Sequence, residues 1–134
     1  MSNILVNQLT GNTTDTTIDV FAGHATDSTT RTNLEQGLAK AWARLESGTA
    51  TRLDNFNVGS STDNGTGDHT VTVTNPFNNT NYSFNGTGDK AGTYFSGATN
   101  STARTTTASR YRMYTDTGAL SNADSSVLFH GDLA

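Results

Sequence analysis

Short runs in which apolar and polar residues alternate dominate the chain from residue 52 onward. Val71 and Val73 alternate with threonines, Tyr111 alternates with Met113 across a polar residue, and Val127 does so with Phe129. A period of two places the apolar side chains on one face of a β-strand. The runs cover 52–61, 69–74, 81–86, 92–97, 109–115 and 126–133, and Asn, Asp, Gly and one Pro separate them. This spacing predicts a compact, antiparallel, all-β domain, either a β-sandwich or a jelly-roll-like fold.

Residues 1–32 predict a short N-terminal strand arm and linker, distinct from the sandwich domain over 33–134. The pattern indicates one apolar strand over 4–9 and an alternating strand over 16–21, joined by a turn at Gly11 and Asn12. Residues 23–32 are polar and aperiodic, so we expect a loop there. An apolar arm can add a strand to the sheet edge of a neighbouring protein. Its candidate docking residues are Ile4, Leu5, Val6 and Leu9.

The segment 33–46 fits two structures. Its apolar residues recur with helical spacing, and Thr32 with Glu35 forms a capping-box pattern, so pattern and propensity alone favour an amphipathic helix. Gly37 interrupts that helix, and the residues from 38 to 45 alternate equally well as a strand. Local sequence therefore leaves both structures open, with the helix favoured.

The pentapeptide NGTGD occurs twice, at 64–68 and at 85–89. An alternating run follows the first copy, and Asn-Gly is a strong hairpin signal, so Asn64, Gly65 and Gly67 predict a hairpin turn. Calcium is the alternative there, with Asp63 and Asp68 as candidate ligands, although the usual loop length and terminal Glu are missing. A phosphate site would need a helix after the glycines instead of a strand. For the second copy we expect a Gly-rich loop.

Composition and charge narrow the classes of function. Threonine makes about a fifth of the chain and only 15% of residues are charged, which favours strands that carry neutral polar groups. The net charge of −4 argues against nucleic-acid binding, and the basic cluster of Arg104, Arg110 and Arg112 predicts a solvated strand face with counterions. The chain has no cysteine for a disulfide or a Cys-based zinc site. Neither a signal peptide nor an apolar run of about 18 residues is found, so we expect no membrane insertion.

Motifs for catalysis are absent. The chain has no nucleophile elbow, zinc-protease helix, P-loop or dinucleotide fingerprint, and its carboxylates are scattered, so we expect no enzyme and no cofactor. His24, His69 and His130 lie in unlike contexts and predict structural or solvent-facing roles. Five aromatic residues could stack on sugar rings, but their alternation favours the core. They are Trp42, Tyr82, Tyr94, Tyr111 and Tyr114.

Three segments resemble a module of tail-fibre and related virion proteins of tailed bacteriophages: NLEQGLAKAWARLE at 33–46, LDNFNVGSSTDNGTGDHTVTV at 53–73 and NYSFNG at 81–86. In that family a GLAKAW segment precedes a hairpin of the pattern D-x-F-N-V-x-S-x-T-D-N-G-x-G-D-Y-T-V. The resemblance covers most of 34–83 closely and the rest loosely. His69 stands where the family more often has Tyr.

The resemblance implies an all-β virion protein that forms a homotrimer, with the N-terminal arm docking on the virion and no catalytic residues. It also favours a strand over 33–46, and we adopt the strand over the locally favoured helix. We expect a tail-fibre-like appendage or adhesin that contacts other virion proteins and, as a further partner, a host-surface glycan. A capsid decoration protein on the major capsid protein is the second hypothesis. A stand-alone carbohydrate-binding module is the third.

Overall fold

The computed structural model describes residues 19–21, 31–33, 38–96 and 104–134 and divides the chain into two units, 1–38 and 39–134. In the first unit β1 (Asp19–Phe21) pairs antiparallel with β2 (Arg31–Asn33). The prediction of a loop over 23–32 is therefore wrong at its last two residues, which belong to β2. The other candidate strand of the arm lies outside the described residues, and with it the candidate docking residues Ile4, Leu5, Val6 and Leu9.

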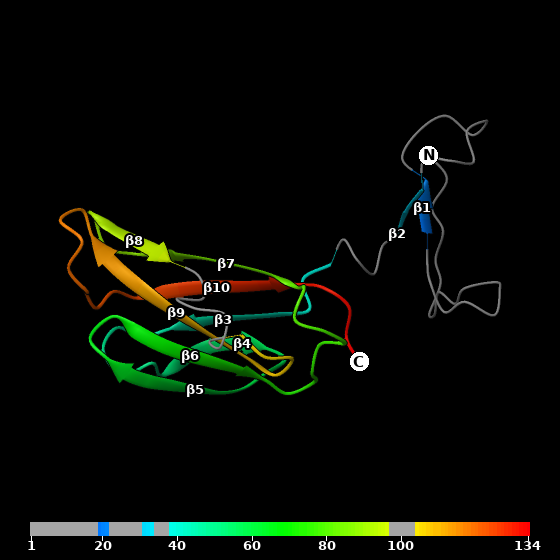
Figure 1. The fold of residues 1–134 in the computed structure, drawn as a ribbon, viewed down its shortest axis with the longest axis horizontal. Helices are drawn as coiled ribbons and strands as arrows, with labels where there is room; N and C mark the ends of the chain where they lie inside the picture. Colours follow the sequence, from blue (N-terminus) through cyan, green and yellow to red (C-terminus); the bar gives the residue numbers. More distant parts are fainter. Residues whose placement is uncertain (1–18, 22–30, 34–37, 97–103) are drawn as a thin grey trace, which may run out of the picture. The chain divides into compact units, whose positions relative to one another are not determined.

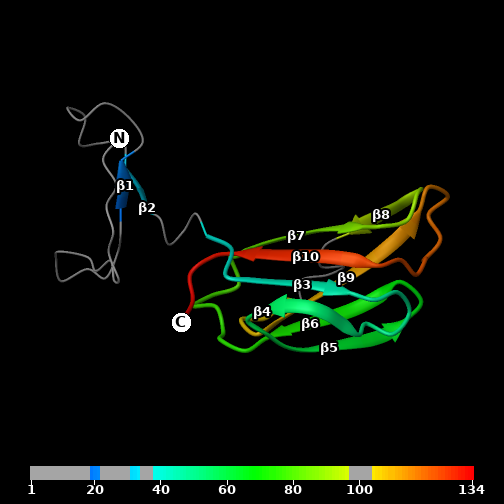
Figure 2. The ribbon, with the colours of Figure 1, turned by 180° about the vertical axis from the view of Figure 1, so that it is seen from behind.

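The second unit is a sandwich of two antiparallel sheets of four strands each (Figures 1 and 2). The first sheet has the order β4 (Arg52–Phe56), β3 (Ala41–Leu45), β10 (Ser125–His130) and β7 (Ser83–Gly88). The second has the order β5 (Val58–Gly65), β6 (Asp68–Val73), β9 (Ala108–Thr115) and β8 (Thr93–Ser96). The described residues form strands and no helix, so the expected all-β sandwich is confirmed.

The segment 41–45 is a strand of the first sheet, between β4 and β10. Ala41, Ala43 and Leu45 are buried, whereas Trp42 and Arg44 face outward. Pairing with the next strand, β4, and with the distant β10 bonds the backbone of β3 on both sides, and this outweighs the local helical periodicity. The adopted strand is confirmed for 41–45, and the helix that local sequence favoured is wrong there.

The predicted strand over 52–61 is broken at Asn57, where the chain passes from the first sheet to the second. Asn57 has φ 55°, a left-handed conformation that asparagine tolerates better than most residues. Its side-chain amide donates to the carbonyl of Lys40 at 2.9 Å and accepts from the backbone N–H of Asn75 at 2.9 Å. The guanidinium of Arg52 donates to the carbonyl of Val58 across the same corner.

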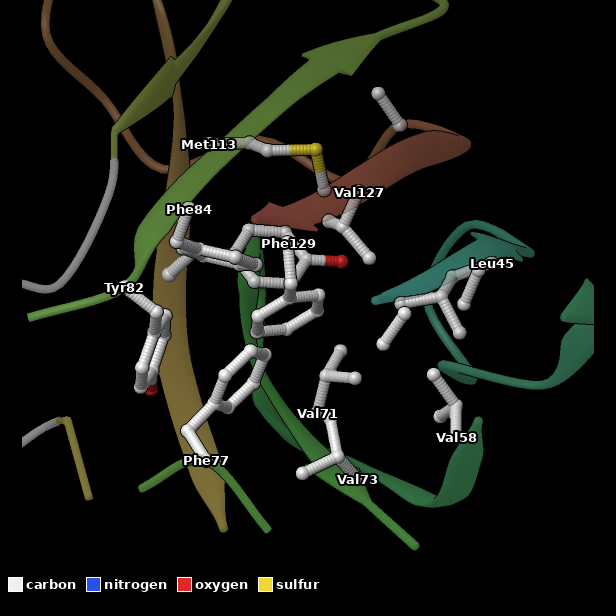
Figure 3. Close-up of a cluster of buried hydrophobic side chains, with 14 residues drawn as sticks. Leu45, Val58, Val71, Val73, Phe77, Tyr82, Phe84, Met113, Val127 and Phe129 are labelled. Carbon is white, nitrogen blue, oxygen red and sulfur yellow. The ribbon is translucent and has the colours of Figure 1, made fainter. Parts of the chain in front are cut away.

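Aromatic and branched side chains from both sheets fill the space between the layers (Figure 3). Phe129 is fully buried near the centre, and its ring centroid lies 4.5 Å from that of Phe84 and 5.8 Å from that of Tyr82. Each buried side chain of this size contributes about 1.5–3 kcal/mol through the removal of apolar surface from water. The predicted inward pairs are confirmed: Val71 with Val73, Tyr111 with Met113, and Val127 with Phe129.

The two copies of NGTGD lie in different structures. The first closes the hairpin between β5 and β6, with Thr66 and Gly67 at the tip and Gly65 paired to Asp68. The second lies within β7 up to Gly88 and pairs with β10. The prediction of a loop for the second copy is therefore wrong, because a partner strand bonds its backbone.

Candidate functional site

The outward side of the first sheet carries an apolar row across its strands. Trp42 of β3 lies opposite Phe56 of β4 and Leu128 of β10, and Leu128 lies opposite Asn85 of β7. Residues directly opposite on paired strands share a face. The exposed fractions are 36% for Trp42, 55% for Phe56 and 37% for Leu128, so a contiguous row of large apolar side chains faces solvent.

The neighbouring row on the same face is polar. Arg44 lies opposite Asp54 and Ser126, and Ser126 lies opposite Thr87. The guanidinium of Arg44 lies 3.3 Å from a carboxylate oxygen of Asp89 and 3.9 Å from one of Asp124. Solvent screens these exposed pairs, so they add little to stability and mainly set the local charge.

A hollow of about 430 Å³ lies over these two rows, lined by outward residues of β3, β7 and β10 together with the buried positions between them. Its side chains include Trp42, Arg44, Asn85, Thr87, Ser126 and Leu128. We define the outer-face hollow by these six residues; Phe56 does not line it.

Sequence reasoning placed Trp42 in the core, and that prediction is wrong. The signal for its true position was the alternation with Ala41, Ala43 and Leu45, which can face inward only if Trp42 faces outward. Tyr82 and Tyr111 are buried as expected. Tyr114 is half-buried, and the side chain of Tyr94 lies outside the described residues.

Asp68, a calcium candidate, is held at the base of the hairpin by two arginines of β9. Its carboxylate accepts from Arg110 Nε at 2.6 Å and Arg110 Nη2 at 2.7 Å, and from Arg112 Nε at 2.7 Å. The hydrogen bond from Arg110 is the largest cause that lowers the pKa of Asp68 to about 2; burial opposes it, and Arg112 adds to the lowering. Two guanidinium groups already occupy this carboxylate, so it does not fit the oxygen-rich, negatively charged site that calcium needs.

The remaining members of the predicted turn serve the hairpin itself. Asp63 accepts a hydrogen bond from the backbone N–H of Gly65 at 2.9 Å, and the amide of Asn64 donates to Thr70 at 2.9 Å. The backbone N–H of Gly67 donates to the side-chain oxygen of Asn122 at 2.6 Å. Within the described ranges no group of three or more His, Cys, Asp or Glu residues could hold a metal ion.

The basic cluster predicted as one solvated face is divided. Arg110 and Arg112 share Asp68 as their counterion, in agreement with part of the expectation. Arg104 instead donates to the carbonyl of Tyr82 at 3.0 Å and lies 5.0 Å from the centroid of the Tyr82 ring. The cluster therefore holds strands together and is not a continuous basic surface.

A buried polar chain joins the two sheets. The hydroxyl of Tyr111 lies 3.2 Å from Nδ1 of His69 and 2.7 Å from the hydroxyl of Ser125, and all three residues are fully buried. Burial lowers the pKa of His69 and raises that of Tyr111 to about 12, so both are neutral near pH 7. His69 has the structural role expected of it. His130 is partly exposed, and His24 lies outside the described residues.

No family model, curated protein or solved structure matches this chain. The part of the chain that the structure describes holds no helix of the length and apolarity needed to cross a membrane. The two four-stranded sheets define the class of fold, an all-β sandwich. The most distinctive surface in its described residues is the outer face with the hollow and the row of Trp42, Phe56 and Leu128.

Proposed function

We propose that this protein is a virion structural protein of a tailed bacteriophage: a tail-fibre-like appendage or adhesin that forms a homotrimer and contacts the host surface. The resemblance of most of 34–83 to the tail-fibre module supports the class of protein. The observation that carries the contact role is the exposed apolar row of Trp42, Phe56 and Leu128, since contiguous apolar surface rimmed by polar groups is typical of a binding face. In this proposal the protein has no catalytic activity.

The edge of the first sheet supports self-association. β4 is the end strand of that sheet, and all five of its residues are exposed, Leu53 by 52%. An open edge with exposed apolar side chains gains by pairing with another chain. Light scattering of the purified full chain at micromolar concentration should give a trimer, and Leu53→Lys should shift it towards monomer. Leu120→Lys, at a residue that is 40% exposed and lies outside the named strands, is the matched control. A monomeric wild type contradicts this part of the proposal.

A capsid decoration protein is the second candidate. The division of the chain into two compact units, 1–38 and 39–134, favours it, because a distinct N-terminal unit can add to the sheet edge of a neighbouring capsomer. Both candidates contact other virion proteins, the tail in the first case and the major capsid protein in the second.

Position and copy number in the particle separate the two candidates. Antibodies against the sandwich should label purified particles at the tail, and quantitative mass spectrometry should give a low ratio to the major capsid protein. Label over the head with a ratio close to that of the capsid lattice would favour decoration. Absence of the protein from purified particles contradicts both.

A further inference from the structure

The outer-face hollow has the volume of a small-ligand site. Pockets that hold ligands typically enclose about 300–1,000 Å³, and this hollow encloses about 430 Å³. Its residues come from three adjacent strands, which lie about 4.8 Å apart, and from two rows about 7 Å apart along each strand. The lined area therefore has the dimensions of one or two sugar rings.

Trp42 gives the hollow an aromatic wall. Its side chain is 36% exposed, and Leu128 on the neighbouring strand lies directly opposite. The C–H faces of a pyranose ring are apolar and broad, so they can pack on an indole and lose contact with water. An indole is also rigid, and holding it against a ligand costs little conformational entropy.

Three other lining residues of the hollow offer neutral hydrogen-bonding groups. Asn85 carries an amide, and Thr87 and Ser126 carry hydroxyls, so the three together can both donate and accept. Sugar hydroxyls need the same mixture of partners. Thr87 and Ser126 are directly opposite each other, and Asn85 is two residues before Thr87 on the same strand. Asn85 thus continues the row of Trp42 and Leu128 on β7, whereas Ser126 and Thr87 belong to the neighbouring row with Arg44. A ligand on the indole would meet polar groups at the β7 end of its own row and along the neighbouring row.

The charges around the hollow favour a neutral ligand. Among the described residues that line it, Arg44 alone is charged, and its guanidinium lies near the carboxylates of Asp89 and Asp124. These acids at one end of the hollow, with the net charge of −4, disfavour acidic sugars and phosphates. The described lining residues therefore offer a ligand an aromatic ring, an amide and hydroxyl groups, and the guanidinium of Arg44 is already paired with Asp89.

We infer that the outer-face hollow binds a neutral pyranose unit of a cell-surface polysaccharide, with the ring stacked on Trp42 and its hydroxyls bonded to Asn85, Thr87 and Ser126. The inference deepens the proposed adhesin role and rests on it for its biological setting. A second copy of the chain is the alternative occupant. It would have to cover the whole apolar row, including Phe56, which lies outside the hollow.

The test titrates the full-length protein with methyl glycosides of glucose, galactose, mannose and N-acetylglucosamine, and with methyl glucuronide as an acidic counterpart. Protein NMR spectra should show that at least one neutral glycoside shifts the Trp42 indole signal and the amide signals of 85–87 and 126–128. The glucuronide should bind more weakly than methyl glucoside. Trp42→Ala should weaken binding about tenfold, and Trp42→Phe should retain part of it.

Leu120→Ala is the matched control, because it truncates an exposed apolar residue outside the hollow and outside the apolar row. It should leave glycoside affinity unchanged, and the dispersion of each variant's spectrum reports whether it is folded. No shift with any glycoside of the panel, or shifts confined to another surface, overturns the inference. So does an equal loss in a folded Leu120→Ala, because the loss in Trp42→Ala would then not be specific to the hollow. Finding the protein in the particle does not depend on these outcomes, so the inference and the proposed function can fail separately.

Discussion

The five residues NGTGD form the end of a hairpin at 64–68 and most of an edge strand at 85–89. In the first copy both glycines have positive φ, 131° at Gly65 and 61° at Gly67. In the second, Gly86 and Gly88 pair with Val127 and Ser125 of β10. Since the two amino-acid sequences are identical, the difference in backbone structure comes from the strands with which each copy pairs.

Each copy meets a different partner. The first is followed at once by the alternating strand β6, which folds back on β5, and its Asp68 meets Arg110 and Arg112. The second follows the buried Phe84, and its residues 85–88 pair with four consecutive residues of β10. A sequence rich in Asn and Gly permits a turn but does not require one, because tertiary pairing decides whether the turn forms.

The largest difference between the two copies in unfolding free energy should come from substitution of their last glycines, Gly67 and Gly88. A Cβ at Gly67 would lie 2.7 Å from the carbonyl oxygen of Ser121, and φ is left-handed, so Gly67→Ala should cost about 3 kcal/mol of unfolding free energy. A Cβ at Gly88 would lie 3.4 Å from Thr93 in ordinary contact, so Gly88→Ala should stabilise by about 0.5 kcal/mol. Urea unfolding of the full chain measures both.

Gly65→Ala is the control that separates backbone strain from crowding, because Gly65 has φ 131° but nothing within 4 Å of the added Cβ. It should cost about 1–2 kcal/mol, between the other two. If Gly67→Ala proves no worse than Gly65→Ala, the close packing of the hairpin tip under residue 121 is not a constraint.

The second largest difference in unfolding free energy should come from the aspartates of the two copies, Asp68 and Asp89. The side chain of Asp68 is 7% exposed and bonds to two arginines, whereas that of Asp89 is 43% exposed and lies 3.3 Å from the guanidinium of Arg44. Asp68→Asn should cost about 2 kcal/mol, since it leaves two guanidinium groups without their counterion. Asp89→Asn should change stability by less than about 0.5 kcal/mol. Equal costs in urea unfolding would mean that burial does not distinguish the pairs.

The dependence of stability on acidic pH should also show the contribution of the Asp68 ion pairs. The pKa of Asp68 is about 2 in the folded protein against 3.8 for an unperturbed carboxyl, so its charged form is favoured by folding. This contribution, about 2 kcal/mol, is complete above about pH 4 and is lost as the pH falls through about 2. The free energy of unfolding of the wild type should therefore converge on that of Asp68→Asn over this range. Curves that stay parallel would contradict the assignment to Asp68.

The sandwich could be predicted from the sequence because alternation in β6, β9 and β10 reports directly which side chains face inward. The strand β3 could not be obtained from local pattern, since its apolar residues also fit a helix and only pairing with β4 and β10 decides. The same holds for the arginines on Asp68, which meet it because of the register between strands 42 or more residues apart.

The outer-face hollow could not be predicted from the sequence. It depends on which side chains from β3, β7 and β10 become neighbours, and so on the order of strands in the first sheet. The outward position of Trp42 was available from its alternation with two alanines and a leucine. The short Ser126 and Thr87 beside it were not, because nothing in the local sequence brings residues 42, 87 and 126 together.

The smallest stability effects should come from the asparagines, and they separate folding from binding. The amide of Asn64 donates to Thr70 across the hairpin at 2.9 Å, so Asn64→Ala should cost about 0.5–1 kcal/mol of unfolding free energy and leave glycoside binding unchanged.

The amide of Asn85 has a longer contact of 3.3 Å to Ser83 on its own strand, so Asn85→Ala should barely alter the free energy of unfolding. Because Asn85 lines the hollow, the same change should weaken glycoside binding several-fold. Urea unfolding and the NMR titration of both variants should show that the first copy of the pentapeptide stabilises the fold and that the second contributes to glycoside binding. A loss of glycoside binding in Asn64→Ala, or no loss in Asn85→Ala, would contradict this difference between the copies.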